Sequence, residues 1–173
     1  TKVEHELGEG ESLVSKTDLK GVITYINSAF AEISGFSENE LIGASHNIVR
    51  HPDMPPAAFA DLWNTVKSGR LWNGIVKNRC KNGDFYWVNA TVTPVKEDGK
   101  VIGYMSVRRK PSRTQIEKAS KEYQQQMTER KETGPSRSNS SGRSIMFKNL
   151  TIKSRLIFII TILSALLLGM GIL

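Results

Sequence analysis

The chain has 173 residues, which is enough for one ordinary domain with attached segments but not for two full hydrophobic cores. Its hydrophobic share of 39% and charged share of 24% are close to those of average globular proteins. The charge is uneven, because residues 1–110 carry 14 Lys and Arg against 13 Asp and Glu, whereas residues 111–173 carry 10 against 4. The basic character therefore belongs to the tail, and the single Cys80 excludes an internal disulfide and fits a reducing compartment.

The first predicted elements are two short strands that form a hairpin. Apolar-rich runs lie at Ser12–Lys16 and Val22–Asn27. The turn between them ends at Gly21, where glycine readily adopts a positive φ.

Two short helices are predicted next. Asn27 and Ser28 are typical N-cap residues for a helix over Ala29–Ile33. The run from Ser37 to Glu40 resembles a capping box and begins a second short helix, which ends at Gly43.

A longer amphipathic helix and three strands follow a proline-rich loop. The helix is indicated by apolar side chains at helical spacing, namely Phe59, Leu62, Trp63 and Val66. The predicted strands are Trp72–Arg79, Phe85–Val95 and Val101–Arg108, and the turns between them contain Asn82-Gly83 and Asp98-Gly99.

Together these elements predict an α+β domain over residues 12–110, with a five-stranded antiparallel sheet and short helices on one face. A sheet cupped against short helices encloses a cavity that suits a cofactor. Residues 1–11 are interpreted as an N-terminal cap, and residues 111–147 as a polar, partly helical linker. A thin apolar stripe in this linker is compatible with a dimer helix or with a solvated spacer, and it consists of Ile116, Ala119, Tyr123 and Met127.

Residues 148–173 read as a basic juxtamembrane segment followed by the start of a transmembrane helix. The 18 residues Leu156–Leu173 carry no charge. As a helix they would reach roughly 27 Å, slightly less than the ~30 Å hydrocarbon core, so we expect an incomplete span. A buried soluble helix is the alternative. Lys148, Lys153 and Arg155 precede the apolar run and place that side in the cytoplasm by the positive-inside bias.

Two groups of residues are candidates for ligand binding. Arg50, His51 and Asp53 lie in the proline-stiffened loop, where a guanidinium fork and a histidine could hold a pyrophosphate. Trp72 and Asn78 share one face of a predicted strand and could stack on and hydrogen-bond a flat heterocycle. Each group also has a structural interpretation: the loop charges satisfy one another, Trp72 belongs to the core and Asn78 begins a turn.

The segments Ile23–Gly43, Asn78–Val95 and Gly103–Arg109 resemble a PAS domain. The stretches His46–Trp63, with its RHPDMP run, and Trp72–Trp87 resemble more narrowly the aerotaxis receptors, whose PAS domain binds FAD noncovalently. The similarity covers about residues 12–109. It implies that Arg50, His51 and Asp53 are needed for FAD binding and that the flavin pocket is lined by Asn27, Asn78, Phe59, Trp63 and Trp72.

The resemblance also implies a function and a cellular setting. We expect a non-enzymatic sensor of redox state or oxygen that signals in aerotaxis, with the PAS domain on the cytoplasmic side of the inner membrane. It implies a homodimer, a membrane anchor, and downstream HAMP and kinase-control regions that these 173 residues do not include. Nucleic-acid binding is disfavoured, because the basic residues lie against an apolar run.

Several alternatives remain open at this point. The light-sensing LOV class of PAS domains needs a reactive cysteine where this chain has His46, and Val88 and Met105 replace two of its flavin-contacting amides. Cys80 falls at a predicted turn, where we expect an exposed, inert thiol. A haem-binding PAS domain could use His46 or His51 as axial ligand. A ligand-free PAS module acting in dimerisation is the other alternative, whereas no set of residues typical of a catalytic flavoprotein is present.

Overall fold

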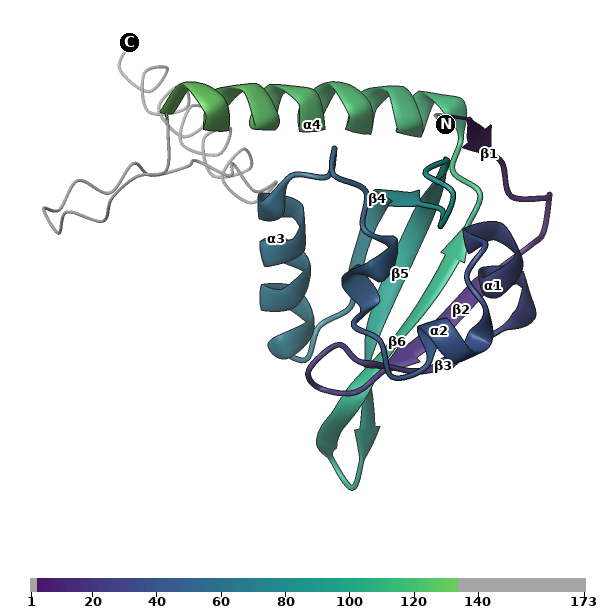
Figure 1. Ribbon diagram of the computed structural model, residues 1–173. Helices are drawn as coiled ribbons and strands as arrows, with labels where there is room; N and C mark the ends of the chain where they lie inside the picture. Colours follow the sequence, from purple (N-terminus) through teal and green to yellow (C-terminus); the bar gives the residue numbers. More distant parts are fainter. Residues whose placement is uncertain (1–2, 134–173) are drawn as a thin grey trace, which may run out of the picture. The chain divides into compact units, whose positions relative to one another are not determined.

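The computed structural model describes residues 3–133 of the chain, and Figure 1 shows their arrangement. The end of the predicted linker 111–147, from residue 134 on, and the predicted segment 148–173 with its membrane span lie outside the described residues. None of the helices formed by residues 3–133 combines the length and apolarity needed to cross a membrane.

The predicted antiparallel strands all form, and they make one sheet. β2 (Leu13–Thr17) and β3 (Ile23–Ile26) form the first hairpin, and β4 (Trp72–Arg79), β5 (Phe85–Glu97) and β6 (Lys100–Arg109) follow. β5 lies between β4 and β6, and β2 joins β6 to β3. β2 ends one residue later than predicted, at Thr17, and the β5–β6 hairpin also extends beyond the predicted strand ends.

The prediction of five strands misses a sixth strand in the region interpreted as a cap. β1 (Glu4–His5) pairs in parallel with Phe85 and Tyr86 at the start of β5. β6 pairs with β5 only between Asn89 and Glu97, so β1 fills the place beside β5 that β6 leaves open. The sheet is therefore mixed rather than purely antiparallel.

Short helices cover one face of this sheet (Figure 1). They are α1 (Ser28–Ser34), α2 (Glu38–Leu41), the 3₁₀ helix η1 (His46–Val49) and α3 (Pro56–Lys67). Asn27 caps α1 as predicted, since its side chain accepts a hydrogen bond from the backbone of Phe30, and Gly35 ends the helix with a φ of 70°. The predicted capping box of Ser37 and Glu40 begins α2.

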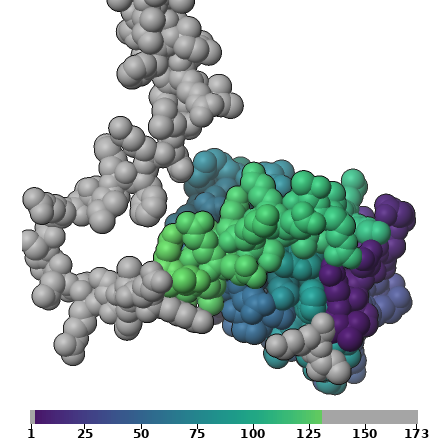
Figure 2. All heavy atoms as spheres, turned by 90° about the horizontal axis from the view of Figure 1, so that it is seen from above, coloured from purple at the N-terminus to yellow at the C-terminus, as the bar shows by residue number. Residues whose placement is uncertain are grey.

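α4 (Arg113–Thr133) occupies the first half of the predicted linker and packs against its own sheet. Figure 2 shows the helix lying along the surface of the domain. Ala119 is buried, and the Tyr123 hydroxyl donates a hydrogen bond of 2.6 Å to the backbone carbonyl of Ile75 in β4. This part of the linker is therefore a docked helix and not a solvated spacer.

The outer edge of β4 is covered from Ile75 to Asn78. The backbone N–H of Lys77 donates to the sulfur of Met54 at 3.3 Å, and Arg50 forms an isolated bridge with Asn78. Tyr123 of α4 occupies the Ile75 carbonyl two residues before Lys77. Two separate chain segments thus satisfy backbone groups that β5 does not reach.

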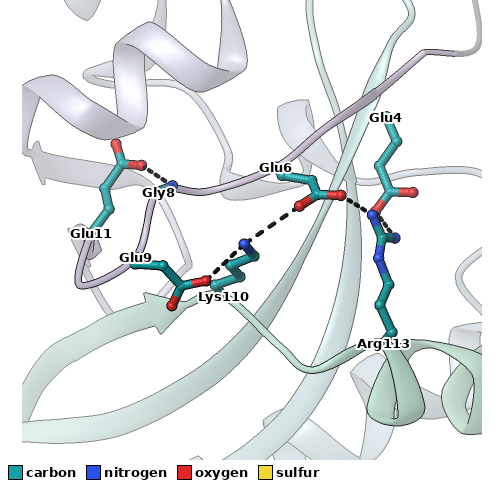
Figure 3. A network of polar contacts seen from close by, with 7 residues as sticks. All are labelled: Glu4, Glu6, Gly8, Glu9, Glu11, Lys110 and Arg113. Carbon is teal, nitrogen blue, oxygen red and sulfur yellow. Dashed lines mark hydrogen bonds and ion pairs between the residues drawn. The ribbon is translucent and has the colours of Figure 1, made fainter.

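A network of ion pairs ties the N-terminal segment to the junction of β6 and α4 (Figure 3). Arg113 pairs with Glu4 at 2.8 Å and also with Glu6. Lys110 pairs with Glu9 at 2.9 Å and with Glu6 at 3.4 Å. We call these five residues the N-terminal ion-pair network. Since the groups are largely exposed, each pair contributes little alone, about 0–1 kcal/mol.

Candidate functional site

A cavity of about 600 Å³ lies between the inner face of the sheet and the helices. Inward-facing strand residues form one wall, among them Ser15, Trp72, Val76, Asn78, Ser106 and Arg108. η1 and α3 supply the opposite wall through His46, Phe59, Leu62 and Trp63. The volume lies within the range of about 300–1,000 Å³ that is typical of small-molecule sites.

A buried cation, Arg108, lies at the inner end of this cavity. Its side chain is only 5% exposed, and its guanidinium donates to the Ser15 hydroxyl at 3.1 Å and to Nε2 of His46 at 2.7 Å. The guanidinium also lies over the ring of Phe30, 5.1 Å from its centroid. Burial lowers the pKa of Arg108 to about 10, so it remains a cation at neutral pH. No carboxylate within residues 3–133 forms an ion pair with it.

Arg108 fixes the protonation state of His46. A guanidinium has only donors, so Nε2 of His46 must be the acceptor, and the imidazole is neutral with its proton on Nδ1. Burial and the charge of Arg108 lower the pKa of His46 to about 3, which agrees with this assignment. The histidine thus acts as a neutral acceptor that positions the cation.

Two buried polar groups of the cavity wall have no hydrogen-bond partner among the described residues. They are Nδ2 of Asn78 and the Ser106 hydroxyl, in residues 4% and 7% exposed. Leaving such a group unpaired costs about 1–3 kcal/mol. A ligand with polar edge atoms would remove this cost.

The other cationic side chains of the wall lie along α3 and the β2–β3 turn. Arg50 lies over the ring of Phe59, 4.0 Å from its centroid, and Lys67 lies over the ring of Trp63 at 5.7 Å. Lys20 is contributed by the β2–β3 turn. Together with Arg108, four cationic side chains line the cavity, and no Asp or Glu does. This imbalance favours an anionic ligand.

The structure brings five of the eight candidate residues together and separates the other three. Arg50, Phe59, Trp63, Trp72 and Asn78 line the cavity. Asn27, His51 and Asp53 are not among its lining residues.

Asn27 is occupied in joining β2 to α1. Its side chain accepts from the backbone of Val14 at 2.9 Å and donates to the carbonyl of Ser12 at 2.8 Å. These bonds give Asn27 a structural role beside the cavity.

His51 and Asp53 make contacts within their loop and with the sheet. Nδ1 of His51 accepts from the backbone N–H of Asp53 at 3.1 Å, and its ring packs edge-on against Phe85. Asp53 pairs with Lys77 at 2.7 Å. Burial and the charge of Lys77 lower the pKa of His51. These contacts correspond to the interpretation in which the loop charges satisfy one another, and a direct role in binding stays a prediction.

The sequence does not predict the buried polar end of the cavity, formed by Ser15, His46, Ser106 and Arg108, although His46 is among the possible haem ligands. The signal was available in part, because Ser106 and Arg108 alternate with apolar residues in a predicted strand and so share a face. A charged residue at a strand end is ordinarily assigned to solvent, which is why Arg108 was not chosen. Its pairing with His46 depends on the fold.

The expectation of an exposed thiol at Cys80 is wrong. The side chain is 3% exposed and donates to the carbonyl of Ile33 at 3.2 Å. Burial and the nearby Asp84 raise the pKa of Cys80 to about 11. The thiol therefore stays protonated and unreactive, for a different reason from the one expected.

Comparison with known proteins gives a consistent result. A sequence profile described as the PAS fold matches residues 23–108. The aerotaxis receptor of Escherichia coli (strain K12) is 52% identical over 110 residues, which cover 64% of this chain and 22% of the receptor. The nitrogen fixation regulatory protein of Klebsiella pneumoniae is 28% identical over 97 residues, covering 56% of this chain and 20% of that protein. The chain thus spans about a fifth of the length of these relatives.

Solved structures with a similar fold include light-oxygen-voltage domains. One, from work on a flavin analogue, superposes with a TM-score of 0.56 at 19% identity and covers 66% of this chain and 86% of that domain. The light state of the blue-light photoreceptor Aureochrome1 LOV also has a TM-score of 0.56 at 19% identity, covering 67% and 91%. At this identity the similarity establishes the fold alone.

Proposed function

Because this chain contains a PAS domain, we propose that its cavity binds FAD noncovalently and that the redox state of the flavin is the signal it detects, as the sensory part of an aerotaxis-type receptor. The observation that carries this proposal is the cavity wall. It combines aromatic side chains with a buried cation, unpaired polar groups and no carboxylate. An isoalloxazine ring with a phosphate tail has the matching chemistry: a flat ring, a polar edge and negative charge.

Different residues would contact the ring, its polar edge and its negative charge. Trp72 and Trp63 offer aromatic surfaces, and Nδ2 of Asn78 and the Ser106 hydroxyl offer hydrogen bonds to a polar ring edge. Arg108 supplies a positive charge that His46 and Ser15 hold in place. When bound, the flavin supplies a ring that takes up and releases electrons. A fixed buried cation favours the more negative state of a bound ring, because the effective dielectric constant around it is low.

β4 connects this cavity to α4. Asn78 faces the cavity, and the carbonyl of Ile75 in the same strand accepts the hydrogen bond from Tyr123. Asn78 would have to change its hydrogen bonding when the protonation of the ring edge changes, at a cost of order 1–3 kcal/mol if it remained unpaired. A displacement of β4 would then move α4 through the hydrogen bond between Ile75 and Tyr123. We propose Asn78 as the first residue of this relay.

Haem is a weaker candidate for this cavity. Nε2 of His46, which would have to bind the iron, accepts hydrogen bonds from Arg108 and Ser15. His51 does not line the cavity. Ligation by His46 would leave the buried guanidinium with only the Ser15 hydroxyl as an acceptor, which is costly.

The test is the absorption spectrum of the full chain as purified and after reconstitution with FAD. We expect oxidised-flavin bands that dithionite bleaches, and complete release of the chromophore as FAD on denaturation. A Soret band would establish haem instead. Protein that stays colourless after reconstitution would contradict the proposal and favour a ligand-free PAS module that acts in dimerisation.

The proposal extends to the setting of the domain. We propose a non-enzymatic sensor on the cytoplasmic side of the inner membrane, active as a homodimer and followed by a membrane anchor, HAMP and kinase-control regions. The similarity to the E. coli aerotaxis receptor supports this. The predicted anchor lies within residues 148–173, which are outside the part of the chain that the structure describes.

A further inference from the structure

We infer that Lys20 and Lys67 form a phosphate subsite at the mouth of the cavity, which binds the diphosphate of a dinucleotide and selects it over a flavin without phosphate. This inference rests on the proposed function, because it concerns the same cavity. It differs from the sequence-based hypothesis, which assigned the pyrophosphate to Arg50, His51 and Asp53.

The cavity has a closed polar end and an open cationic end. Arg108, Asn78 and Ser106 at one end are nearly inaccessible to solvent. Leu19, Lys20 and Lys67 also line the cavity but are exposed, so they mark its mouth. A ligand that places its ring against the buried groups therefore leads its tail out past these lysines.

Trp63 lies on the same face of α3 as Lys67, one of the two lysines. Phe59, Trp63 and Lys67 follow one another at intervals of four residues and so lie along one face of α3. The ammonium of Lys67 lies over the Trp63 ring, 5.7 Å from its centroid.

The β2–β3 turn approaches the same ring from the other side of the mouth. A Cβ atom at Gly21 would lie only 3.1 Å from the Trp63 ring, so the turn packs directly on it. The φ of Gly21 is +82°, which glycine adopts without strain. The residue before Gly21 in this turn is Lys20, which lines the same cavity as Trp63 and Lys67.

Neither lysine is neutralised within the described part of the chain. No ion pair to Lys20 or Lys67 occurs among residues 3–133. Two carboxylates accept hydrogen bonds from lining residues, and neither forms an ion pair with Lys20 or Lys67. Asp18 accepts from the backbone of Lys20 and Val22, at 2.8 and 2.9 Å, and Asp61 accepts from Nε1 of Trp72 at 2.8 Å.

The charge at the mouth matches a diphosphate. The Lys67 ammonium lies over Trp63, Lys20 lines the same cavity from the β2–β3 turn, and Arg50, which follows η1, lies over Phe59. Ammonium groups bind phosphate oxygens as point charges, whatever the direction of approach. The competing explanation is that Lys67 only complements the C-terminal end of α3 and that Lys20 is solvated.

The experiment compares ligands that share a ring but differ in phosphate. Dissociation constants of FAD, FMN, riboflavin and ADP are measured for the full apoprotein as wild type, Lys20→Gln, Lys67→Gln and the double variant. Lys100→Gln is the control, because Lys100 is exposed in the β5–β6 hairpin and does not line the cavity. We expect the double variant to bind FAD and ADP about tenfold or more weakly, with riboflavin within about twofold of wild type.

The outcomes separate the inference from the proposed function. If the double variant binds FAD and riboflavin equally more weakly, the lysines only support the fold. If its affinity for FAD is unchanged, the lysines do not bind phosphate. Either result overturns the inference while the proposal of flavin binding stands. If no flavin binds but ADP does, and the double variant loses it, the subsite stands and the proposed function fails. If the wild type binds neither flavin nor ADP, both fail.

Discussion

The hydrogen bond between Arg108 and His46 has a consequence for stability that can be measured. His46 has a pKa of about 3 in the folded protein and about 6.5 when unfolded. A histidine with a lowered folded pKa contributes its full stabilisation above pH 6.5, and this contribution is lost as the pH falls towards 3.

We therefore predict that the free energy of unfolding falls by up to about 1.4 kcal/mol per pH unit below pH 6.5, in addition to other acid effects. His46→Gln should remove this part of the slope. Urea unfolding between pH 7 and pH 4.5 measures it. The exposed Asn39→Ala variant should retain the wild-type slope, and an equal slope in His46→Gln would show that His46 is not the group that titrates.

Arg50 and Asp53 should differ in their effect on FAD binding, although the sequence groups them together. Arg50 lines the cavity, whereas Asp53 pairs with Lys77 outside it. Arg50→Ala should weaken FAD about tenfold to a hundredfold, since a charge-assisted contact is lost. Asp53→Ala should weaken it less.

Flavin retention after dialysis, with Asn39→Ala as control, measures this difference. A larger loss for Asp53→Ala than for Arg50→Ala would place the binding function in the loop itself. Equal retention in all three variants would make both residues structural.

At the residue scale, the alternation of side chains along a strand predicted part of the candidate site. Trp72 and Asn78 were placed on one strand face by alternation, and both line the cavity. Arg108 was missed because its burial depends on acceptors from β2 and η1, far away in sequence. Asn27 was assigned both as an N-cap and as a pocket residue, and the structure shows the first role.

Among the elements, α4 is held to the sheet by a contact that a conservative substitution removes. Tyr123→Phe deletes only the hydroxyl that donates to the Ile75 carbonyl. We expect a loss of about 0.5–1.5 kcal/mol in the free energy of unfolding and faster amide exchange in β4. Tyr25→Phe is the matched control, because Tyr25 is 47% exposed. If the two variants behave alike, the Tyr123 bond contributes nothing to docking.

The N-terminal ion-pair network should hold β1 and the start of α4 together in a salt-dependent way. Arg113→Ala removes the pairs to Glu4 and Glu6. Because these groups are exposed, we expect a change below about 1 kcal/mol in global stability. Amide exchange in residues 3–6 and 113–117 should nevertheless accelerate.

High salt should abolish this difference, because the pairs are screened. Lys118→Ala, on an exposed position of α4, should leave exchange unchanged. An effect of Arg113→Ala that persists at high salt would indicate packing rather than charge.

The elements that the sequence predicted well are those with local signals. The β2–β3 and β5–β6 hairpins, the α1 cap and the α2 capping box all depend on residues adjacent in the chain. β1 has no such signal, since two residues become a strand only beside β5. The sequence likewise did not predict that α4 docks on its own sheet, because a thin apolar stripe does not specify the surface that it packs against.

For the whole molecule, the sequence predicted the hairpins and a cavity between the sheet and the helices, but not the pairing of β2 with β6 or the full lining of the cavity. The arrangement of two strands, short helices and three strands is characteristic enough to predict an α+β sheet with one covered face. The cavity requires side chains from β2, η1, α3 and β4 at once. Local patterns indicate which face a residue occupies, but not the distance to the opposite wall.

Membrane topology is a prediction at this scale. Lys148, Lys153 and Arg155 precede Leu156–Leu173 in the part of the chain that the structure does not describe. By the positive-inside bias, we expect residues 1–147 in the cytoplasm. Reporter fusions at the N-terminus of the membrane-inserted protein should be active only as cytoplasmic reporters. Periplasmic activity would refute this orientation and the proposed setting with it.

The covered edge of β4 also bears on how copies of this domain can meet. An exposed edge strand is a template on which another chain can add a strand, and this is a common route to aggregation. Here Met54 and Tyr123 occupy two of the backbone groups that an incoming strand would need, the N–H of Lys77 and the carbonyl of Ile75. Growth of the sheet at β4 therefore requires that α4 first leave. The bond from Tyr123 to Ile75 thus covers part of this edge, and we expect a variant that loosens α4 to self-associate more readily than the wild type.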